Sequence, residues 1–388
     1  MAVKAWTLCD VANDVYLPDF SISGADLGLE DRGISISKRV LRGGMSDGVE
    51  VLRVANGACA FTVLPTRGMN IWKAWIGDWD IGWRSPVQGP IHPQFVPTGE
   101  PSGLGWLDGF DELLARCGLE SNGAPEYDEM GRLRYGLHGR ISNKPAHHVE
   151  VRVDPDAGEI AVTGVVDEAR FLFTHLRLTT TISTRFGERS FQIRDEVENL
   201  SARNGEMQLL YHINLGAPLL EPGAQVIVPA SAVVPKDNRA AEGVDTWNVY
   251  GEPEAGFAEQ VYFFEALADA QQNTGALLKN ASGTRGVSIH YNKQQLPHFI
   301  VWKNTGALED GYVTGLEPST NFPNARTFEA KHGRVVKLPP GGKATFDLRL
   351  EFHNDAASVA QAEEALRKLQ GGEGPKIHHS PQQGWSPA

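Results

Sequence analysis

A chain of 388 residues, 41% of them hydrophobic and 22% charged, has the composition of a globular protein that buries a large core, which argues against intrinsic disorder. Its formal net charge of −12 argues against nucleic acids and anionic membranes as partners, because proteins bind those through clustered Lys and Arg. The first residues lack the apolar segment of a secretory signal, and no run of about 18 apolar residues predicts a membrane span. We therefore expect a cytoplasmic protein. The three cysteines, Cys9, Cys59 and Cys117, are odd in number and have no paired spacing, so we expect reduced thiols.

The first part of the chain predicts short strands and one hairpin. Residues 1–48 contain short Ile-rich alternation and predict either a few short strands or a wrapping arm. Residues 49–64 predict a hairpin, because two strand-like runs flank Asn56-Gly57, a dipeptide typical of a type I′ turn with positive φ at both central residues. The hairpin places Arg67 just beyond a strand end.

A loop-rich aromatic region follows. Glycines and prolines separate its five tryptophans, which favours either the walls of a cleft or a plug at the end of a sandwich, and indole faces suit the C–H faces of sugar rings. Residues 108–116 predict one short helix, followed by a turn over residues 117–123. The tryptophans are Trp72, Trp75, Trp79, Trp83 and Trp106.

From residue 147 onward, apolar and polar residues alternate with period two, as in a sheet with one buried face. Strand follows strand with almost no helix between them, so parallel α/β folds fit poorly. We predict an all-β fold, a large antiparallel β-sandwich with few short helices. Expected strands include 149–153, 159–162, 176–183, 191–197, 207–213, 225–228, 261–264, 287–291, 298–303 and 344–352.

The sandwich is expected to form a single domain over residues 1–370. One amphipathic helix, about residues 356–369, carries apolar side chains along one side and ends before Gly371-Gly372. Residues 371–388 are rich in Gly, Pro, Gln and Ser and predict a polar, solvated tail that supplies no core.

Several polar residues lie at strand ends or inside apolar strands. Glu317 separates an apolar run from a loop rich in Pro and Asn, where partial desolvation would bring its pKa toward that of a general base. His212 interrupts an apolar strand and is followed by Asn214, which indicates either a polar cavity or a satisfied core histidine. Glycines flank His138 and Arg140, which permits either the close approach of a ligand or a tight turn.

In chain order, these segments resemble the aldose 1-epimerase (galactose mutarotase-like) superfamily, and most closely its group of unknown function DUF4432. The resemblance rests on three segments and covers about residues 45–355. It implies the galactose mutarotase-like supersandwich fold. The segments are Leu137-His138-Gly139, Tyr211-His-Ile-Asn-Leu-Gly216 and Leu316-Glu-Pro-Ser-Thr-Asn-Phe-Pro-Asn324.

The resemblance also implies a role for each matching residue. Glu317 would be the general base on the anomeric hydroxyl, and His212 the general acid on the ring oxygen. His138 and Arg67 would bind the sugar. We therefore expect an isomerase of the aldose 1-epimerase type that uses no metal and no cofactor, because one acid and one base suffice for mutarotation.

The sequence departs from the family pattern near both catalytic positions. No Tyr-Phe pair follows His212, and Pro318-Ser319 stand where the family has Thr-Gln. Only Asp237 and Asp245 are candidates for the mid-chain aspartate that binds sugar in the family. These differences from the family pattern bear on which sugar is the substrate more than on the fold.

Other functions remain open. The same acid and base would serve an enediol-type epimerase or isomerase of a keto or acidic sugar, with Arg67, Arg140 and Lys303 as groups for an anion or as surface ion-pair partners. A carbohydrate-binding protein without turnover is a further alternative. No glycine-rich phosphate cradle predicts a nucleotide site. The expected partner is a small carbohydrate, and a homodimer is one assembly that the sequence allows. The predicted substrate-binding residues are His138, Arg67, Arg140, Asn214 and Lys303.

A metal site is the remaining alternative. His138, His212 and Glu317 together form a known set of metal ligands. The sequence spacing neither supports nor excludes such a site.

Overall fold

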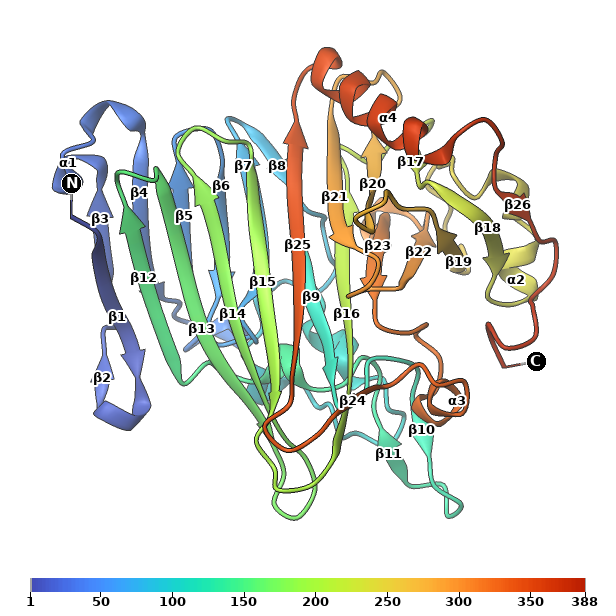
Figure 1. The fold of residues 1–388 in the computed structure, drawn as a ribbon, viewed down its shortest axis with the longest axis horizontal. Coiled ribbons are helices and arrows are strands. Elements are labelled where there is room, and N and C mark those ends of the chain that lie inside the picture. Colours follow the sequence, from blue (N-terminus) through green and yellow to red (C-terminus); the bar gives the residue numbers. More distant parts are fainter. Residues whose placement is uncertain (1, 388) are drawn as a thin grey trace.

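Two antiparallel β-sheets pack face to face in the computed structural model, which describes residues 2–387 (Figure 1). Alternation is clear in the central strands of the first sheet: along residues 175–185 every second residue is buried, as the period-two pattern predicts. In order across this ten-stranded sheet, the strands are β17 (Gln225–Ile227), β20 (Asn273–Lys279), β21 (Gly286–Asn292), β25 (Lys343–His353), β15 (Ser190–Asn199), β14 (His175–Arg185), β13 (Glu159–Ala169), β12 (His148–Asp154), β1 (Lys4–Asp10) and β2 (Val15–Tyr16).

The second sheet has fourteen strands, and its central strands are buried on both faces. In order they are β26 (Lys376–Ile377), β18 (Ala230–Pro235), β19 (Gln260–Ala266), β22 (His298–Asn304), β23 (Val313–Ser319), β16 (Gly205–Gly216), β9 (Leu114–Leu119), β7 (Asn70–Ile76), β6 (Ala60–Leu64), β5 (Glu50–Asn56), β4 (Ile34–Val40) and β3 (Phe20–Ser23), while β8 (Trp79–Ile81) pairs with β7 and β24 (Val336–Leu338) with β16. A separate hairpin contains β10 (Glu126–Tyr127) and β11 (Leu133–Tyr135).

The main core fills the space between the two sheets, and one buried ion pair crosses it. Arg116 of β9 places Nε 2.6 Å from Oδ2 of Asp195 on β15, and both side chains are fully buried. The hydroxyl of Tyr211 also donates to Asp195, at 2.8 Å. Buried charges are stable only when they are paired and hydrogen-bonded, so this contact fixes how the two sheets lie against each other.

Helices are few and short, as predicted. They are α1 (Gly24–Leu27), α2 (Asn238–Ala241), α3 (Arg326–Lys331) and α4 (Ala356–Gln370). The predicted amphipathic helix is confirmed as α4, in which the side chain of the N-cap Asp355 accepts from the backbone N–H of Ser358. Its buried residues Val359 and Leu366 pack on Leu277 of the ten-stranded sheet. Within residues 2–387 no helix is long and apolar enough to cross a membrane.

The helix predicted over residues 108–116 is wrong. A 3-10 turn ends at Gly109, and the chain then enters β9, in which all six residues are buried. A strand buried on both faces gives a continuous apolar run, which periodicity alone cannot distinguish from a helix.

The hairpin over residues 49–64 is confirmed, but its turn differs from the prediction. Asn56 is the last residue of β5, and the central residues of the turn are Gly57 and Ala58, of which only Gly57 has positive φ (96°). Glycine at the first central position is typical of a type II′ turn. The Asn56 side chain accepts from the backbone N–H groups of Ala58 and Cys59, both at 2.9 Å.

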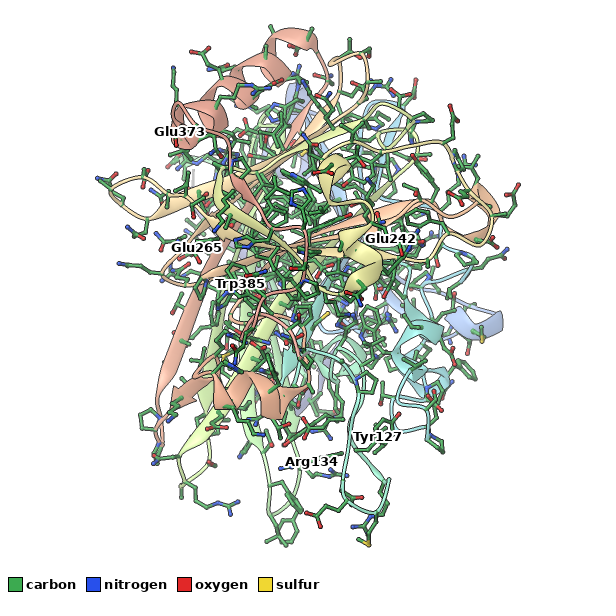
Figure 2. The ribbon with its side chains drawn as sticks, turned by 90° about the vertical axis from the view of Figure 1, so that its right-hand side faces the viewer. Tyr127, Arg134, Glu242, Glu265, Glu373 and Trp385 are labelled. Atoms are coloured by element: carbon green, nitrogen blue, oxygen red, sulfur yellow. The ribbon has the colours of Figure 1, made fainter. Side chains whose placement is uncertain are left out.

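The composition of the tail led us to expect a solvated segment, but the structure shows that part of it docks on the protein. Lys376–Ile377 pairs with β18 as the parallel edge strand β26. The indole of Trp385 stacks on Phe322 with ring centroids 5.1 Å apart, and the backbone carbonyl of Trp385 accepts from Asn324 Nδ2 at 2.8 Å. Figure 2 labels Trp385 on the side of the molecule that carries this tail.

Candidate active site

The candidate catalytic residues lie on the face of the fourteen-stranded sheet that points away from the main core, here called the outer face. His212 belongs to β16 and Glu317 to β23, and these strands are neighbours with Ile213 opposite Leu316. Because side chains alternate along a strand, His212 and Glu317 share the outer face while Ile213 and Leu316 enter the main core.

Gly315 makes the room that the two side chains occupy. A Cβ atom at this position would lie 2.5 Å from Oε1 of Glu317 and 3.0 Å from Cε1 of His212. A side chain at this position would therefore force the Glu317 carboxylate to move from its place beside His212. Glycine at this point of β23 is therefore a condition for bringing the two groups together.

The two candidate residues are in contact and almost completely buried. Nε2 of His212 lies 3.3 Å from Oε1 of Glu317, and the residues are 4% and 2% exposed. No hydrogen bond to Oε1 exists within residues 2–387. An unsatisfied buried carboxylate oxygen is costly, so its retention suits an atom that exchanges a proton or binds a ligand.

The tautomer of His212 follows from its neighbour Asn214. The amide nitrogen of Asn214 donates to the backbone carbonyls of Glu112 (2.9 Å) and His212 (3.2 Å), which leaves Oδ1 as an acceptor. This oxygen lies 2.6 Å from Nδ1 of His212, so Nδ1 carries a hydrogen. In the neutral ring, Nε2 therefore presents a lone pair toward Glu317.

Burial favours the uncharged form of both groups. It raises the pKa of Glu317 well above its ordinary value, and the charge of Glu259 adds to this while that of Lys236 opposes it. Burial also lowers the pKa of the His212 ring well below its ordinary value, with His138 adding to the effect. Burial therefore favours a proton on the carboxyl group of Glu317 over the charged pair with the proton on Nε2.

His138 lies beside the pair, on the loop between β11 and β12. Its ring centroid is 5.2 Å from that of His212 at an interplanar angle of 81°, and its Nδ1 lies 2.9 Å from the carbonyl oxygen of Asn122. Burial lowers its pKa to about 4, so the ring is neutral at pH 7. The backbone of His138 adopts a left-handed conformation (φ 57°), which is uncommon for a residue with a side chain and clusters at functional sites.

Aromatic side chains line the rest of the site. The ring centroids of Phe110, Trp302 and Trp106 lie 5.1, 5.4 and 6.1 Å from that of His212. Trp302 is partly exposed and directly opposes Gly315 in the neighbouring strand. This lining offers flat apolar faces around a small polar centre, as sugar sites do.

Three of the five early tryptophans lie in the two largest apolar clusters. Trp83 and Trp106 belong to the apolar cluster of the outer face, whereas Trp79 belongs to the main core. Trp72 donates from its ring nitrogen to Asp111.

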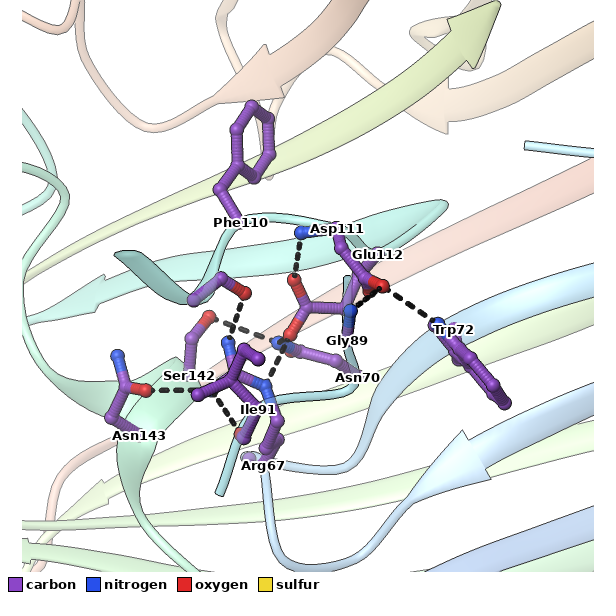
Figure 3. A network of polar contacts seen from close by, with 12 residues as sticks. Arg67, Asn70, Trp72, Gly89, Ile91, Phe110, Asp111, Glu112, Ser142 and Asn143 are labelled. Atoms are coloured by element: carbon purple, nitrogen blue, oxygen red, sulfur yellow. Dashed lines mark hydrogen bonds and ion pairs between the residues drawn. The ribbon is translucent and has the colours of Figure 1, made fainter. Parts of the chain in front are cut away.

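The structure brings together four of the seven predicted residues, namely Glu317, His212, Asn214 and His138, and places the other three elsewhere. Arg67 lies behind the site in a buried network (Figure 3), in which its guanidinium donates to Glu112, Ile91 O, Asn143 and Gly109 O. Since the carbonyl of Glu112 holds Asn214, Arg67 supports the site from behind.

Arg140 and Lys303 are engaged away from the pair. Arg140 binds Glu120 (2.9 Å) and Glu168 (3.4 Å). Lys303 opposes Thr314 and therefore lies on the core face of the sheet, where its Nζ donates to the carbonyls of Thr246 and Val249 and burial lowers its pKa to about 8.

The residues near the pair that escaped the sequence analysis include Gly315, Trp302 and Phe110. Trp302 directly precedes Lys303, and alternation places only one of the two on the outer face. The face becomes known only from the pairing of Trp302 with Gly315. No signal in the sequence indicates which of these neighbours faces the site.

The metal alternative finds no geometric support. Within residues 2–387, no three His, Cys, Asp or Glu side chains are arranged to hold a metal ion. In His138 and His212 the Nδ1 atoms already contact Asn122 and Asn214.

A cavity of about 690 Å³ lies between the β13–β14 loop and α3, and neither His212 nor Glu317 lines it.

Comparisons with known proteins place this geometry in context. Residues 46–352 match the family described as a domain of unknown function (DUF4432). No curated protein matches the sequence. A crystal structure from Klebsiella pneumoniae, named "putative aldose 1-epimerase", is 36% identical with a TM-score of 0.94 and covers 98% of this chain and 99% of its own.

More distant structures share the fold. A galactose mutarotase-like protein from Clostridium acetobutylicum is 15% identical (TM-score 0.56, covering 82% of this chain and 98% of its own). Galactose 1-epimerase from Lactobacillus acidophilus is 11% identical (TM-score 0.53, covering 83% and 99%). At such identities the likeness concerns the fold alone, and it confirms the predicted galactose mutarotase-like β-sandwich.

Proposed function

The chain belongs to the DUF4432 family, and from this premise we propose that it is a carbohydrate isomerase that interconverts sugar anomers, as aldose 1-epimerases do. The observation that carries the proposal is the contact between His212 and Glu317, two almost completely buried groups whose Nε2 and Oε1 atoms lie 3.3 Å apart. Mutarotation requires one acid and one base close to the anomeric centre.

The proposed reaction starts from a pair that holds one proton. With the shared proton on His212, the Glu317 carboxylate takes the proton from the O1 hydroxyl while His212 gives its proton to the ring oxygen. The C1–O5 bond breaks and an open-chain aldehyde forms. After rotation about the C1–C2 bond, both proton transfers reverse and the ring closes on the other face of the aldehyde.

The surroundings of the pair support this cycle. After ring opening, Glu317 holds a proton and His212 is neutral, which is the state that burial favours. The site thereby stabilises the open-chain intermediate relative to the charged pair. Neutral His138 and the indole of Trp302 are assigned to substrate binding, through a hydroxyl group and through a sugar C–H face respectively.

The test is anomer exchange measured by NMR in D₂O on a panel of aldoses. Glu317→Gln and His212→Asn should each lower turnover by about 10²–10⁴-fold while the fold is kept. The matched controls Glu309→Gln and His175→Asn alter exposed residues and should leave turnover unchanged.

Two outcomes would contradict the proposal. Full activity of either site variant would remove that residue from the mechanism. Deuterium incorporated at C2 would instead indicate enediol chemistry, because mutarotation breaks no C–H bond.

A further inference from the structure

Lys236 lies on the outer face at the end of β18, which β19 and β22 separate from β23. It directly follows β18, where Val234 pairs with Phe263, and its backbone N–H donates to the carbonyl of Val261 at 2.9 Å, so the ladder continues through it. Val234 belongs to the apolar cluster of the outer face. Alternation therefore places Lys236 on this face, two positions further along the same edge of the site.

The charge of Lys236 reaches the site. It opposes the rise in the pKa of Glu317 and contributes to the lowered pKa of His138. The sheet register agrees with this, because Lys236 continues the row in which Val261 opposes Trp302 and Trp302 opposes Gly315, so it lies on the same row of the outer face as the aromatic wall of the site.

The ammonium group of Lys236 has no partner of its own. Throughout the part of the chain that the structure describes, it forms no ion pair and no side-chain hydrogen bond, although the residue is only partly exposed. The other predicted cations are all engaged: Arg67 with Glu112, Arg140 with Glu120, and Lys303 with two carbonyls. In a chain of net charge −12, an unpaired and partly buried cation at a site is a place for an anionic ligand.

Glu259 does not neutralise this charge. Its carboxylate accepts from Nε1 of Trp302 at 2.6 Å and lies at the exposed rim. The ammonium group of Lys236 would therefore attract an anion bound at this end of the site.

Building on the proposed function, we infer that the substrate is an acidic sugar whose anionic group, a carboxylate or a phosphate ester, binds to Lys236. The anomeric end lies at His212 and Glu317, and the anionic group lies toward β18. Lys236 is thus a specificity-determining residue.

The test compares three series of aldoses: glucose and galactose, their uronic acids, and their 6-phosphates. The quantity measured is the ratio of kcat/KM for the acidic sugar to that for its neutral parent. We expect a ratio of about ten or more in the wild type for one acidic series, which identifies the anionic group. Lys236→Met should reduce the ratio to about one and Lys236→Arg should retain most of it. Lys331→Met, an exposed control, should not change it.

The ratio separates substrate selection from any effect of Lys236 on Glu317, since such an effect acts on both sugars. Equal exchange of neutral and acidic sugars, or an acidic preference that persists in Lys236→Met, overturns the inference while the proposed function stands. If no sugar shows accelerated exchange, the proposed function fails. In that case, tighter calorimetric binding of an acidic sugar than of its parent, lost in Lys236→Met, still supports the inference, and equal binding overturns it.

Discussion

The Nε2 atom of His212 lies 3.3 Å from Oε1 of Glu317, on neighbouring strands of one sheet, with both side chains almost completely buried. At this distance the two groups do not titrate independently, because a charge on either one changes the proton affinity of the other. In the proposed reaction one proton serves the pair, and its position decides which group acts as acid. The sheet register holds the two members of this proposed acid–base couple in contact.

Asn214 should control this couple through the tautomer of His212. Asn214→Ala removes the acceptor for the Nδ1 hydrogen, which frees the ring to place its proton on either nitrogen. One buried hydrogen bond of this kind contributes about 1–3 kcal/mol, so turnover should fall roughly 10- to 100-fold. Anomer exchange followed across pH 5–9 should also show an altered profile.

The control for this variant is Asn292→Ala, which removes a partly exposed amide on the ten-stranded sheet. It should leave the rate of anomer exchange unchanged. Wild-type activity and an unchanged pH profile in Asn214→Ala would show that the tautomer is set by another contact.

Gly315→Ala should damage the site by steric conflict. The added methyl group would lie 2.5 Å from Oε1 of Glu317, so the carboxylate must move away from His212 or the strand must shift. We expect at least a 100-fold loss of turnover, the scale typical of small displacements of catalytic groups. Gly251→Ala is the matched control, because a Cβ there meets no atom within 4 Å. Equal activity of both variants would mean that the pair tolerates separation.

Much of the fold could be predicted from local pattern, and the helix wrongly predicted over residues 108–116 shows where that pattern is missing. Half-buried strands of the ten-stranded sheet alternate clearly, and helix α4 shows its apolar side at helical spacing. Strand β9 is buried on both faces and carries no such signal. Its identity as a strand depends on its pairing with β16 and β7, which only the assembled sheet reveals.

The site divides in the same way. His212 and Glu317 could be predicted because a polar residue within an apolar strand is unusual and the family resemblance gave each a role. The sequence could not tell which face of the sheet Lys303 and Lys236 occupy, because a cation near a strand end has the same sequence pattern on either face. The pairing of Lys303 with Thr314 shows that Lys303 lies on the core face. The continuation of the ladder beyond Pro235 shows that Lys236 lies on the outer face.

The tail should contribute to stability, contrary to its composition. Removing residues 373–388 exposes Phe322 and deletes edge strand β26, so we expect the Tm to fall by several degrees. Trp385→Ala should produce part of the same loss, about 2–5 °C, because the indole is only partly buried. Gln383→Ala alters an exposed residue of the same tail and serves as the control in thermal unfolding. An unchanged Tm after truncation would indicate that the docked tail adds no net stability.

Asp111 should make stability depend on pH. Burial, followed by the negative charge of Glu112, raises the pKa of Asp111 from an ordinary 3.8 to about 7, against a hydrogen bond from Trp72. Between these two values the folded state holds a proton that the unfolded state has released. The free energy of unfolding must therefore decrease as pH rises from about 4 to 7, and the stabilisation present at low pH is lost as pH passes 7.

Asp111→Asn removes this titration while keeping an oxygen that can accept from Trp72 and Gly89. The difference in unfolding free energy, variant minus wild type, should rise with pH by up to about 1.4 kcal/mol per unit across the window and level off above it. Urea unfolding at half-unit steps from pH 4.5 to 8.5 measures it, with the exposed Asp108→Asn as control. A difference that stays constant with pH would show that Asp111 is ionised throughout. In that case its negative charge would be stabilised by the Arg67 network that also holds Glu112, and through it Asn214, in place.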